Sequence, residues 1–356
     1  MLKGEVIHSY RILEDFKVAG GTSKVTFAER GGKEYFIKEF LSPKYPTADS
    51  PGSEKVKAQK RKACEEFEKH HKELNARINS KVGTGGNLVA AVDFFREGPC
   101  YYKVTEKIDV SSLTCKEISC LSMDKLLLIC KSVCHSVKIL HDLNIVHGDL
   151  KPDNILIKKT SAGYSGKLID FDDSYFTGAP PKQECLVGTP EYYSPEQATY
   201  IMDEDEEMSG STLTLKSDIF TLGIIFCEYL TGRKPLFDTK YSSTWSCVAD
   251  GGKIKFSGAL SNGFEEVLRK MLSLNPINRP SIGEVFEFFK GVKDDGKTMS
   301  ATDSPTISTP ASKGLRGSGL GIGGTKTSKT DELDTSHPSS SSSSPSKLRI
   351  GKGLKV

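Results

Sequence analysis

Residues 147–154 read His-Gly-Asp-Leu-Lys-Pro-Asp-Asn and bring an acid, a cation and an amide close together in the chain. The acid is Asp149, the cation is Lys151 and the amide is Asn154. Apolar runs precede and follow this polar, proline-containing octet. The pattern predicts a loop held between two buried elements, which is a common setting for catalytic groups. A surface loop of accidental polarity would look the same, so residues elsewhere in the chain must decide.

The octet resembles the catalytic loop of Ser/Thr protein kinases, whose pattern is His-Arg-Asp-Leu-Lys-Pro-x-Asn. The resemblance implies that Asp149 accepts the proton of the attacking hydroxyl, that Lys151 neutralises the travelling phosphoryl group, and that Asn154 holds Mg²⁺. The Lys at position 151 favours Ser or Thr acceptors over Tyr. Gly148 replaces the arginine of the pattern, so the loop is of the non-RD type, meaning that it lacks an arginine before the catalytic aspartate.

A glycine-containing stretch from Val18 to Val25 is similar to the kinase phosphate loop, Gly-x-Gly-x-x-Gly-x-Val. Gly20 fills the central glycine position and Gly21 follows it, whereas Val18 and Ser23 replace the outer glycines. Glycines allow backbone N–H groups to approach a phosphate closely because no Cβ intervenes. Most two-glycine turns only close hairpins, so this match gains its weight from its position ahead of the next motif.

Lys38 follows in an otherwise apolar strand and matches the strand lysine that binds the α- and β-phosphates of ATP in kinases. By default, a lone lysine in a strand lies on an exposed face. In the family this lysine needs a carboxylate from the next helix, predicted here over 54–78. Glu68 and Glu73 are the candidates, and Glu66 is a weaker one. Glu68 is preferred because it lies beside an inward-facing stripe formed by Phe67, His71, Leu74 and Ile78.

Two more strands are predicted over 88–95 and 100–105, and the following residues resemble the hinge between kinase lobes. The resemblance places Glu106 in this hinge, where adenine would pair with backbone groups. It also places Leu156 where kinases have an apolar floor under the adenine. An ordinary core leucine is equally consistent with that position.

Residues 167–172, Lys-Leu-Ile-Asp-Phe-Asp, resemble an apolar strand followed by the Asp-Phe-Gly metal motif. Asp170 would bridge Mg²⁺ to the β- and γ-phosphates of ATP. Asp172 replaces the usual glycine, and because Asp adopts positive φ less readily than Gly we expect a stiffer backbone that resists outward motion of Phe171.

Further family positions follow in the expected order. A helix over 124–143 would deliver the catalytic loop. Residues 188–196 are similar to the Gly-Thr-x-x-Tyr-x-x-Pro-Glu segment, Asp218 matches the aspartate that anchors the catalytic loop, and Arg279 matches the partner of Glu196. The ordered series predicts an α+β, bilobal protein-kinase-like fold over 10–292. Its small lobe would be β-rich, about 10–106, and its large lobe mainly helical, about 107–292.

The composition of the chain excludes several other classes of protein. The chain has 356 residues, 37% of them hydrophobic, which is enough for a sizeable core, and its net charge of +3 does not indicate nucleic-acid binding. No run is apolar for long enough to span a membrane, and the N-terminus does not resemble a signal peptide. The nine cysteines show no metal spacing, so we expect reduced thiols in a cytoplasmic protein. The Ser-, Thr-, Gly- and Lys-rich tail, 293–356, is predicted to be disordered.

The sequence therefore predicts a cytoplasmic Ser/Thr protein kinase that uses ATP and Mg²⁺ on protein substrates. The tail is interpreted as inert or as a docking peptide for a partner, and the acidic stretch 202–208 as a solvated loop or an attractant for basic substrates. Two alternatives stay open. His147-Gly148-Asp149 also matches the His-Gly-Asp of aminoglycoside-type small-molecule phosphotransferases, although Lys151 stands where those have His. The replaced glycines are instead typical of a pseudokinase scaffold.

Overall fold

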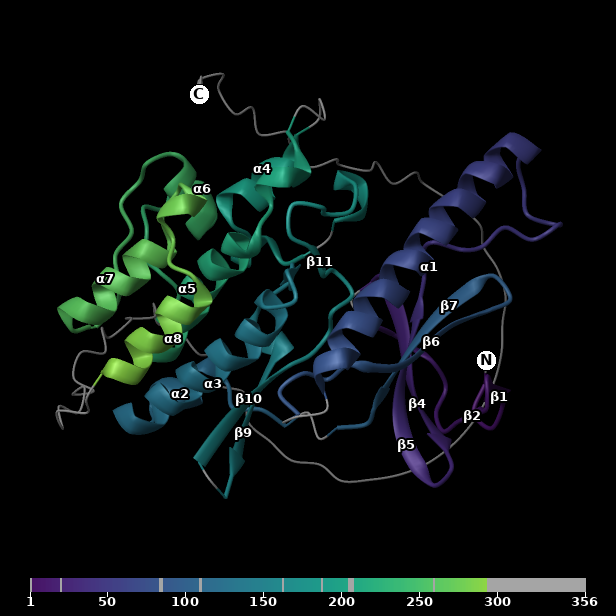
Figure 1. The fold of residues 1–356 in the computed structure, drawn as a ribbon, viewed down its shortest axis with the longest axis horizontal. Helices are drawn as coiled ribbons and strands as arrows, with labels where there is room; N and C mark the ends of the chain where they lie inside the picture. Colours follow the sequence, from purple (N-terminus) through teal and green to yellow (C-terminus); the bar gives the residue numbers. More distant parts are fainter. Residues whose placement is uncertain are drawn as a thin grey trace, which may run out of the picture. The chain divides into compact units, whose positions relative to one another are not determined.

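The structure, a computed structural model, describes residues 2–292 apart from 20, 83–85, 109–110, 162, 187, 204–207 and 259. Within them it confirms the predicted fold class, a β-rich small lobe followed by a mainly helical large lobe (Figure 1). The predicted tail, 293–356, and most of the acidic stretch lie outside the described residues. No helix among the described residues is long and apolar enough to cross a membrane.

The small lobe is built on an antiparallel sheet with seven strands among the described residues. The sheet order is β1-β2-β4-β5-β7-β6, and β3 also pairs with β4. Side chains of β5 alternate between the two faces, so Tyr35 and Ile37 are buried in one core while Lys38 lies on the opposite face. The strands are β1 (Val6–Ile7), β2 (Tyr10–Ile12), β3 (Lys17–Ala19), β4 (Ser23–Arg30), β5 (Lys33–Phe40), β6 (Ala91–Glu97) and β7 (Cys100–Glu106).

Two strand limits differ from the prediction. The sheet begins at β1, four residues ahead of the predicted domain start at Tyr10. The strand expected over 88–95 begins only at Ala91. The residues before it leave the sheet because Val89 donates its backbone N–H to the carbonyl oxygen of Leu168 in the large lobe (2.9 Å). This segment therefore links the lobes instead of extending β6.

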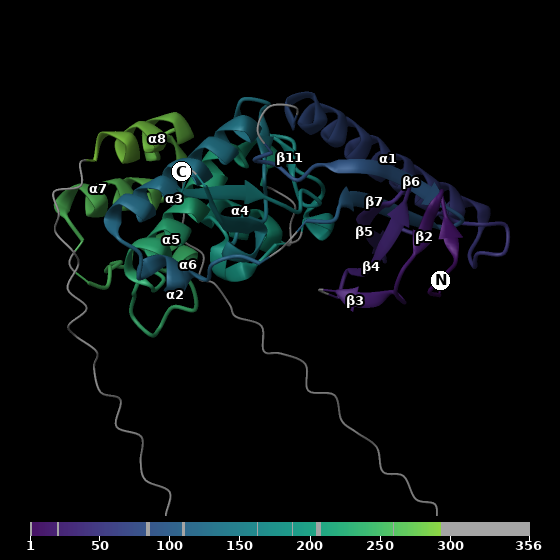
Figure 2. The same cartoon turned by 90° about the horizontal axis from the view of Figure 1, so that it is seen from below.

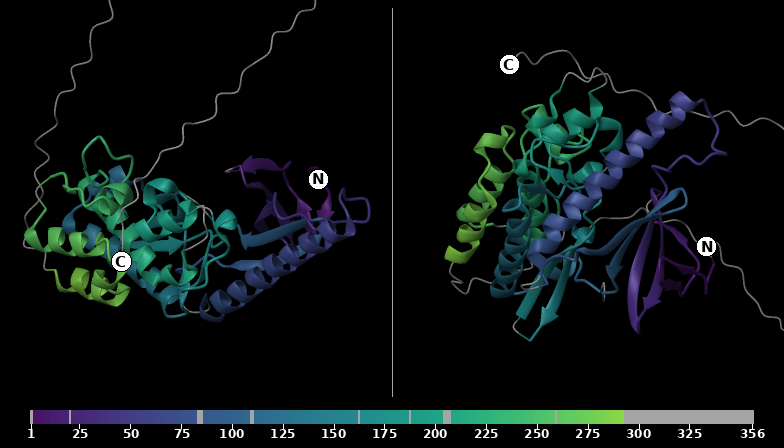
Figure 3. Two further views of the ribbon diagram at one scale, coloured as in Figure 1. Left: turned by 90° about the horizontal axis from the view of Figure 1, so that it is seen from above. Right: turned by 45° about the vertical axis from the view of Figure 1, so that its right-hand side comes forward.

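Helix α1 (Glu54–Val82) crosses one face of the small-lobe sheet, and its C-terminal end points toward the large lobe (Figure 2). The helix predicted over 54–78 is thus confirmed and slightly longer. Its last turns contact the segment after β10: the ring of His70 lies 2.9 Å from the carbonyl oxygen of Ser174, and the Arg77 guanidinium stacks over Phe176. Both views in Figure 3 show α1 bridging the two lobes in this way.

The large lobe packs its helices around α5, which is buried over nearly its whole length. Thr214 caps the N-terminus of α5, and Gly232 ends it in the left-handed conformation with φ +74°. Two short ladders, β8 with β11 and β9 with β10, lie beside α3. The helices are α2 (Cys115–Ser119), α3 (Met123–His141), α4 (Pro195–Met202), α5 (Leu215–Thr231), α6 (Thr244–Ala249), α7 (Asn262–Met271) and α8 (Ile282–Gly291). The ladder strands are β8 (Ile145–Val146), β9 (Ile155–Thr160), β10 (Gly163–Leu168) and β11 (Tyr175–Phe176). Short 3₁₀ turns cover Pro152–Asn154, Gln183–Cys185, Pro190–Tyr192, Gly210–Thr212 and Pro276–Asn278.

The predicted ion pair between Glu196 and Arg279 is confirmed, and it ties α4 to the residues before α8. Arg279 is 1% exposed and binds both oxygens of Glu196 through its two terminal nitrogens, at 2.6 and 2.8 Å. Its remaining N–H groups donate to backbone carbonyl oxygens of Ser273, Leu274 and Lys216. Every guanidinium donor is therefore used, which is the condition under which a buried arginine is tolerated.

We expect Glu196→Ala to lower the free energy of unfolding by about 3–5 kcal/mol, because Arg279 would keep a buried charge without its counter-charge. Chemical denaturation of the purified variant measures this loss. The matched control is Glu266→Ala, which removes an exposed carboxylate paired with Lys270 one helical turn away. Equal losses for the two variants would contradict a stabilising role of the buried pair.

Candidate functional site

Asp218 of α5 anchors the backbone at the start of the loop over 147–154. The Asp218 carboxylate accepts hydrogen bonds from the backbone N–H groups of His147 (2.8 Å) and Gly148 (3.3 Å), and His141 contacts the same carboxylate at 3.0 Å. The predicted anchoring role of Asp218 is confirmed. Because these bonds reach the backbone, they set the direction of the next residue, Asp149.

The side chains that the sequence singles out in this loop are in contact with one another. They are those of Asp149, Lys151 and Asn154. Lys151 donates to the Asp149 carboxylate at 2.7 Å, and the Asn154 side-chain amide donates to the same carboxylate (3.1 Å) and to the Asp149 backbone carbonyl (2.8 Å). Thr189 joins the group: its hydroxyl donates to Asp149 (3.0 Å) and accepts from Lys151 (2.9 Å). The carboxylate is therefore held in a single orientation by three neighbours.

A second group of charges lies where the small lobe faces the segment after β10. Lys38 of β5 and Lys103 of β7 lie opposite each other in the sheet register, and Asp170 and Asp172 meet them from the large lobe. The Lys38 ammonium lies 2.5 Å from Asp172 Oδ2 and 3.2 Å from Asp170, while Lys103 lies 3.2 Å from Asp170 and also pairs with Asp172. We call these four residues the lysine–aspartate cluster.

The cluster stabilises its own charges against the cost of burial. Burial alone would raise the pKa of Asp172, but the ammonium groups of Lys103 and Lys38 outweigh it and hold that pKa well below its usual value. Burial alone would lower the pKa of Lys38, but the carboxylates of Asp172 and Asp170 reverse the shift to an increase. Both groups therefore stay ionised at neutral pH.

The pair expected between Lys38 and Glu68 is not formed in this structure. Glu68 lies at the flank of α1 and pairs with Lys72 one turn later, with its side chain 31% exposed. The predicted inward stripe itself is confirmed, since His71, Leu74 and Ile78 are buried. Glu68 directly follows Phe67, so it lies about 100° around the helix from that member of the stripe, because successive helix residues are about 100° apart. The carboxylate facing Lys38 comes from Asp172 instead.

His71 is the residue of α1 that approaches the cluster. Its ring is buried among Phe40, Phe67 and Phe94. Burial, together with the nearby positive charges of His70, Lys103 and Lys38, holds the pKa of His71 well below its usual value. The imidazole is therefore neutral and adds no charge beside the two lysines.

The predicted phosphate loop connects β3 to β4. Val18 is exposed, and Gly21 has φ +74° with open space where a Cβ would stand. Ser23 is buried and donates its hydroxyl to the carbonyl oxygen of Ala19 (3.1 Å), closing the turn in place of a glycine. Val25 lies opposite Lys38 in the register of β4 and β5. Gly20 lies outside the described residues.

The two residues predicted to border the adenine lie on separate strands. Glu106 is the last residue of β7, opposite Tyr35 of β5. Leu156 lies in β9 and is buried. Their roles toward a nucleotide stay predictions, because neither position distinguishes a ligand contact from a structural one.

The donors near Asp149 suit a magnesium ion that is shared with phosphates. The described residues contain no group of three or more His, Cys, Asp and Glu that could hold a metal by themselves. Mg²⁺ is commonly bound by one or two protein oxygens together with substrate phosphates and water. The Asp170 side chain is 39% exposed, and Asn154 uses its amide nitrogen inside the loop, leaving the amide oxygen for a cation. This donor set fits Mg²⁺ bound with ATP.

Asp173, directly after the cluster, has a carboxyl group whose pKa is raised. Burial first, and then the negative charges of Asp172, Asp149 and Asp170, raise the pKa of Asp173 to about 7. The backbone carbonyl of Asp173 also faces Gly148, which has φ +81°: a Cβ at Gly148 would lie 2.3 Å from that oxygen. The chain thus passes very close to the catalytic loop here.

Sequence reasoning missed Lys103 and Thr189 as members of the site. Lys103 occupies an ordinary alternating position in an apolar strand, and only the pairing with β5 reveals its neighbour. Thr189 did carry a signal, because it is the Thr of the Gly-Thr-x-x-Tyr-x-x-Pro-Glu segment. The resemblance identified that segment but assigned it no contact with Asp149.

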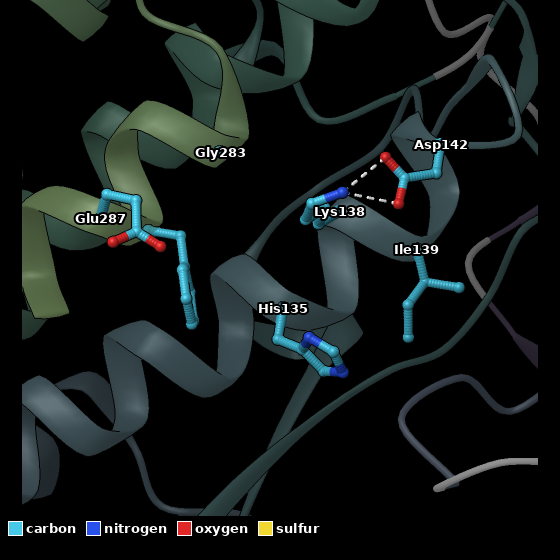
Figure 4. A pocket seen from close by; sticks show the side chains of 7 residues that line it. His135, Lys138, Ile139, Asp142, Gly283 and Glu287 are labelled. Atoms are coloured by element: carbon cyan, nitrogen blue, oxygen red, sulfur yellow. Dashed lines mark hydrogen bonds and ion pairs between the residues drawn. The ribbon is translucent and has the colours of Figure 1, made fainter.

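A groove elsewhere in the large lobe contains none of these residues. It lies between α3 and α8, with an ion pair between Lys138 and Asp142 (2.7 Å) at one side (Figure 4). Its lining residues are His135, Lys138, Ile139, Asp142, Gly283, Phe286 and Glu287.

Comparison with known proteins agrees with this geometry. The sequence model of the protein kinase domain matches residues 52–288. The chain is 32% identical over 159 residues to the ovarian-specific serine/threonine-protein kinase Lok of Drosophila melanogaster, covering 44% of this chain and 32% of Lok. It is 31% identical over 210 residues to the serine/threonine-protein kinase shk1/pak1 of Schizosaccharomyces pombe, covering 56% and 29%. It is also 33% identical over 168 residues to the putative serine/threonine-protein kinase R436 of Acanthamoeba polyphaga mimivirus, covering 46% and 56%. The chain thus spans at most about half the length of these relatives.

The raised pKa of Asp173 predicts a pH-dependent stability. The unfolded carboxyl ionises near pH 4 and the folded one near pH 7, so the protein loses stability as the pH rises through this window. Asp173→Asn removes that penalty. We expect it to stabilise the nucleotide-free protein by on the order of 2 kcal/mol at pH 8 and to have little effect at pH 4. Thermal melts of both proteins across this range measure the difference.

The control for this prediction is Asp142→Asn, at the exposed end of α3. At pH 8 this variant should not raise the melting temperature as Asp173→Asn does, because the Asp142 carboxylate is exposed and paired with Lys138. A stabilisation by Asp173→Asn that is the same at both pH values would contradict a raised pKa of Asp173.

Proposed function

This chain belongs to the protein kinase family, and from that premise we propose that it is an active Ser/Thr protein kinase, which transfers the γ-phosphoryl group of ATP to hydroxyl groups of proteins. The observation that carries the proposal is a network of three mutually hydrogen-bonded side chains. Asp149 and Lys151 lie on a loop anchored from α5, and Thr189 joins them from the segment 188–196. Phosphoryl transfer requires positioning and charge neutralisation more than covalent chemistry, and this arrangement supplies both.

Each residue has a distinct task in this proposal. Asp149 orients the acceptor hydroxyl and takes its proton. Lys151, already bound to Asp149, provides positive charge beside the transferring group. Lys38 binds the α- and β-phosphates, and the backbone of the turn at Gly21 covers them. Glu106 and Leu156 border the adenine.

ATP and Mg²⁺ are the proposed cosubstrate and cofactor. Asp170 and Asn154 would hold the metal, because the Asp170 carboxylate is partly exposed and Asn154 donates through its amide nitrogen, which leaves its amide oxygen for a cation. When bound, Mg²⁺ neutralises charge that develops on the phosphate oxygens. Asp170 contacts Lys38 and Lys103 in the structure, so its carboxylate already lies beside the lysine that is proposed to bind the phosphates.

The two alternatives receive less support. A small-molecule phosphotransferase of the aminoglycoside type would share His147-Gly148-Asp149, but it would not call for Lys151 on Asp149 or for the buried pair of Glu196 and Arg279. A pseudokinase scaffold would not need to keep Asp149 in a network of three side-chain neighbours. Both alternatives remain outcomes of the experiments below.

The proposed substrates are proteins with Ser or Thr acceptors, the acceptors that Lys151 of the loop favours. We place the protein in the cytoplasm as part of the same proposal, because none of its nine cysteines forms a disulfide, and several, such as Cys130 and Cys134, are buried thiols with raised pKa. The tail, for which a docking role was one of the two interpretations, lies outside the described residues.

We expect Asp149→Asn to lower kcat for a generic peptide by about 100-fold or more while leaving the affinity for MgATP nearly unchanged, because the acceptor hydroxyl and not ATP is held there. Asp170→Asn should instead weaken MgATP binding, since it removes a metal ligand. Initial rates and parallel titrations with MgATP on the folded variants measure both effects. Full activity of Asp149→Asn would refute the role of this residue.

Gly148 provides no arginine to bind a phosphate on the activation segment, which predicts activity without phosphorylation there. Of the four candidate hydroxyls, those of Ser174 and Tyr175 are buried, whereas Thr177 and Thr189 are partly exposed. Thr177 is the one to monitor, because the Thr189 hydroxyl is already hydrogen-bonded to Asp149 and Lys151. The protein is treated with phosphatase, the loss of phosphate is verified by mass spectrometry, and rates on a peptide are measured. We expect at least about half of the rate to remain. A rate that collapses and returns with phosphate on Thr177 would show that another cation performs the arginine's task.

A further inference from the structure

Two lysines lie opposite each other on the same face of the small-lobe sheet. Lys38 and Lys103 are register partners in the antiparallel strands β5 and β7. Like charges at directly opposite positions of a sheet repel each other, and a lysine that is 8% exposed, as Lys103 is, loses most of its hydration. Such a pair is stable only when anions lie between or beside the two ammonium groups.

Asp172 provides that anion, and it is better placed to do so permanently than Asp170. The Asp172 side chain is only 9% exposed, with Oδ2 on Lys38 and Oδ1 on Lys103. Asp170 contacts both lysines at 3.2 Å, but it is more exposed and is also the proposed metal ligand. The two carboxylates balance the two lysines, and only Asp172 has no second task.

Helix α1 supplies no carboxylate at this place in the structure. The contacts of its glutamates run along the helix, from Glu68 to Lys72 and from Glu73 to Arg77. The α1 residue that approaches the two lysines is His71, which is buried among aromatic rings and neutral. The charge that Lys38 needs must therefore come from elsewhere.

We propose that Asp172 is the positioning residue for Lys38, in place of a glutamate of α1, and that Lys103 is the cation that holds Asp172 in place. Asp172 holds the Lys38 ammonium where it can bind the phosphates of ATP, and Lys103 compensates the charge that remains on Asp172 after Lys38 turns toward a phosphate. The inference rests on the proposed function only in that the chain must bind MgATP.

With Asp172 as its partner, the position of Lys38 no longer depends on the position of helix α1. A carboxylate on α1 would hold Lys38 only while the helix stays close to the sheet. Asp172 follows β10 by four residues and is fixed by Lys103 of the sheet itself. Lys38 is therefore positioned without a contribution from the acidic residues of α1.

The test compares the affinities of two probes, MgATP and adenosine, by calorimetry. Adenosine has no phosphates and so does not require Lys38. Asp172→Asn should weaken MgATP binding by about tenfold or more, the range expected for losing a charge-assisted contact, and leave adenosine binding unchanged. Glu68→Gln is the rival variant, and its loss of MgATP affinity should be smaller than that of Asp172→Asn.

A double variant, Lys103→Met/Asp172→Asn, guards against simple misfolding. Asp172→Asn alone leaves two lysines facing one aspartate, whereas the double variant leaves Lys38 with Asp170 and a balanced charge. We expect the double variant to melt at a higher temperature than Asp172→Asn while still binding MgATP weakly. A double variant that binds MgATP like the parent protein would overturn the proposal.

Other results also decide the matter. Equal losses for MgATP and adenosine would mean that Asp172 only supports the fold and would overturn its positioning role. A larger effect of Glu68→Gln than of Asp172→Asn would overturn it too, as would a parent protein that binds MgATP no more tightly than adenosine. A parent protein that shows the expected affinities but transfers no phosphate would support the positioning role and contradict the proposed function.

Discussion

The catalytic loop depends on one buried carboxylate, that of Asp218. It accepts two backbone N–H groups from the loop and contacts His141, so its charge is compensated although it is removed from water. Asp218 is itself fixed because α5 is buried on almost every side and is capped at both ends. The orientation of Asp149 is therefore set by the core of the large lobe, and the exposed residues around the loop contribute little to it.

The same rule, that a buried charge needs a fixed partner, explains the other polar contacts. Arg279 is tolerated in the core because Glu196 and three carbonyl oxygens use all its donors. The lysine–aspartate cluster applies the rule between lobes, where the sheet supplies the cations and the segment after β10 supplies the anions. The ion pairs of this cluster thus connect the two lobes. Removing one of its four charged side chains would leave the other three with a net charge.

Whether a feature could be predicted from the sequence depends on how far apart its interacting residues lie along the chain, and on whether they belong to a recognisable motif. The loop around Asp149 was predictable because its chemistry lies within a few consecutive residues, and Asp218 and Arg279 because they occupy fixed places in an ordered series. The partner of Lys38 was not predictable in the same way. Proximity to an apolar stripe favoured Glu68, yet the helical phase turned it outward. Lys103 could not be recognised because its meeting with Lys38 depends on the register of strands 65 positions apart.

The absence of an arginine before Asp149 is built into the backbone path. At Gly148, φ is +81° and a Cβ would lie 2.3 Å from the Asp173 carbonyl oxygen, so any side chain there would force the two segments apart. The segment after the cluster and helix α4 each contact the backbone of the catalytic loop through an uncharged side chain. Ser174 donates its hydroxyl to the His147 carbonyl, and Gln197 donates its amide to the Gly148 carbonyl, each at 2.9 Å. Because these bonds form between neutral groups, they hold the segment and α4 against the loop without a cation before Asp149, at the same close approach that leaves no room for an arginine side chain there.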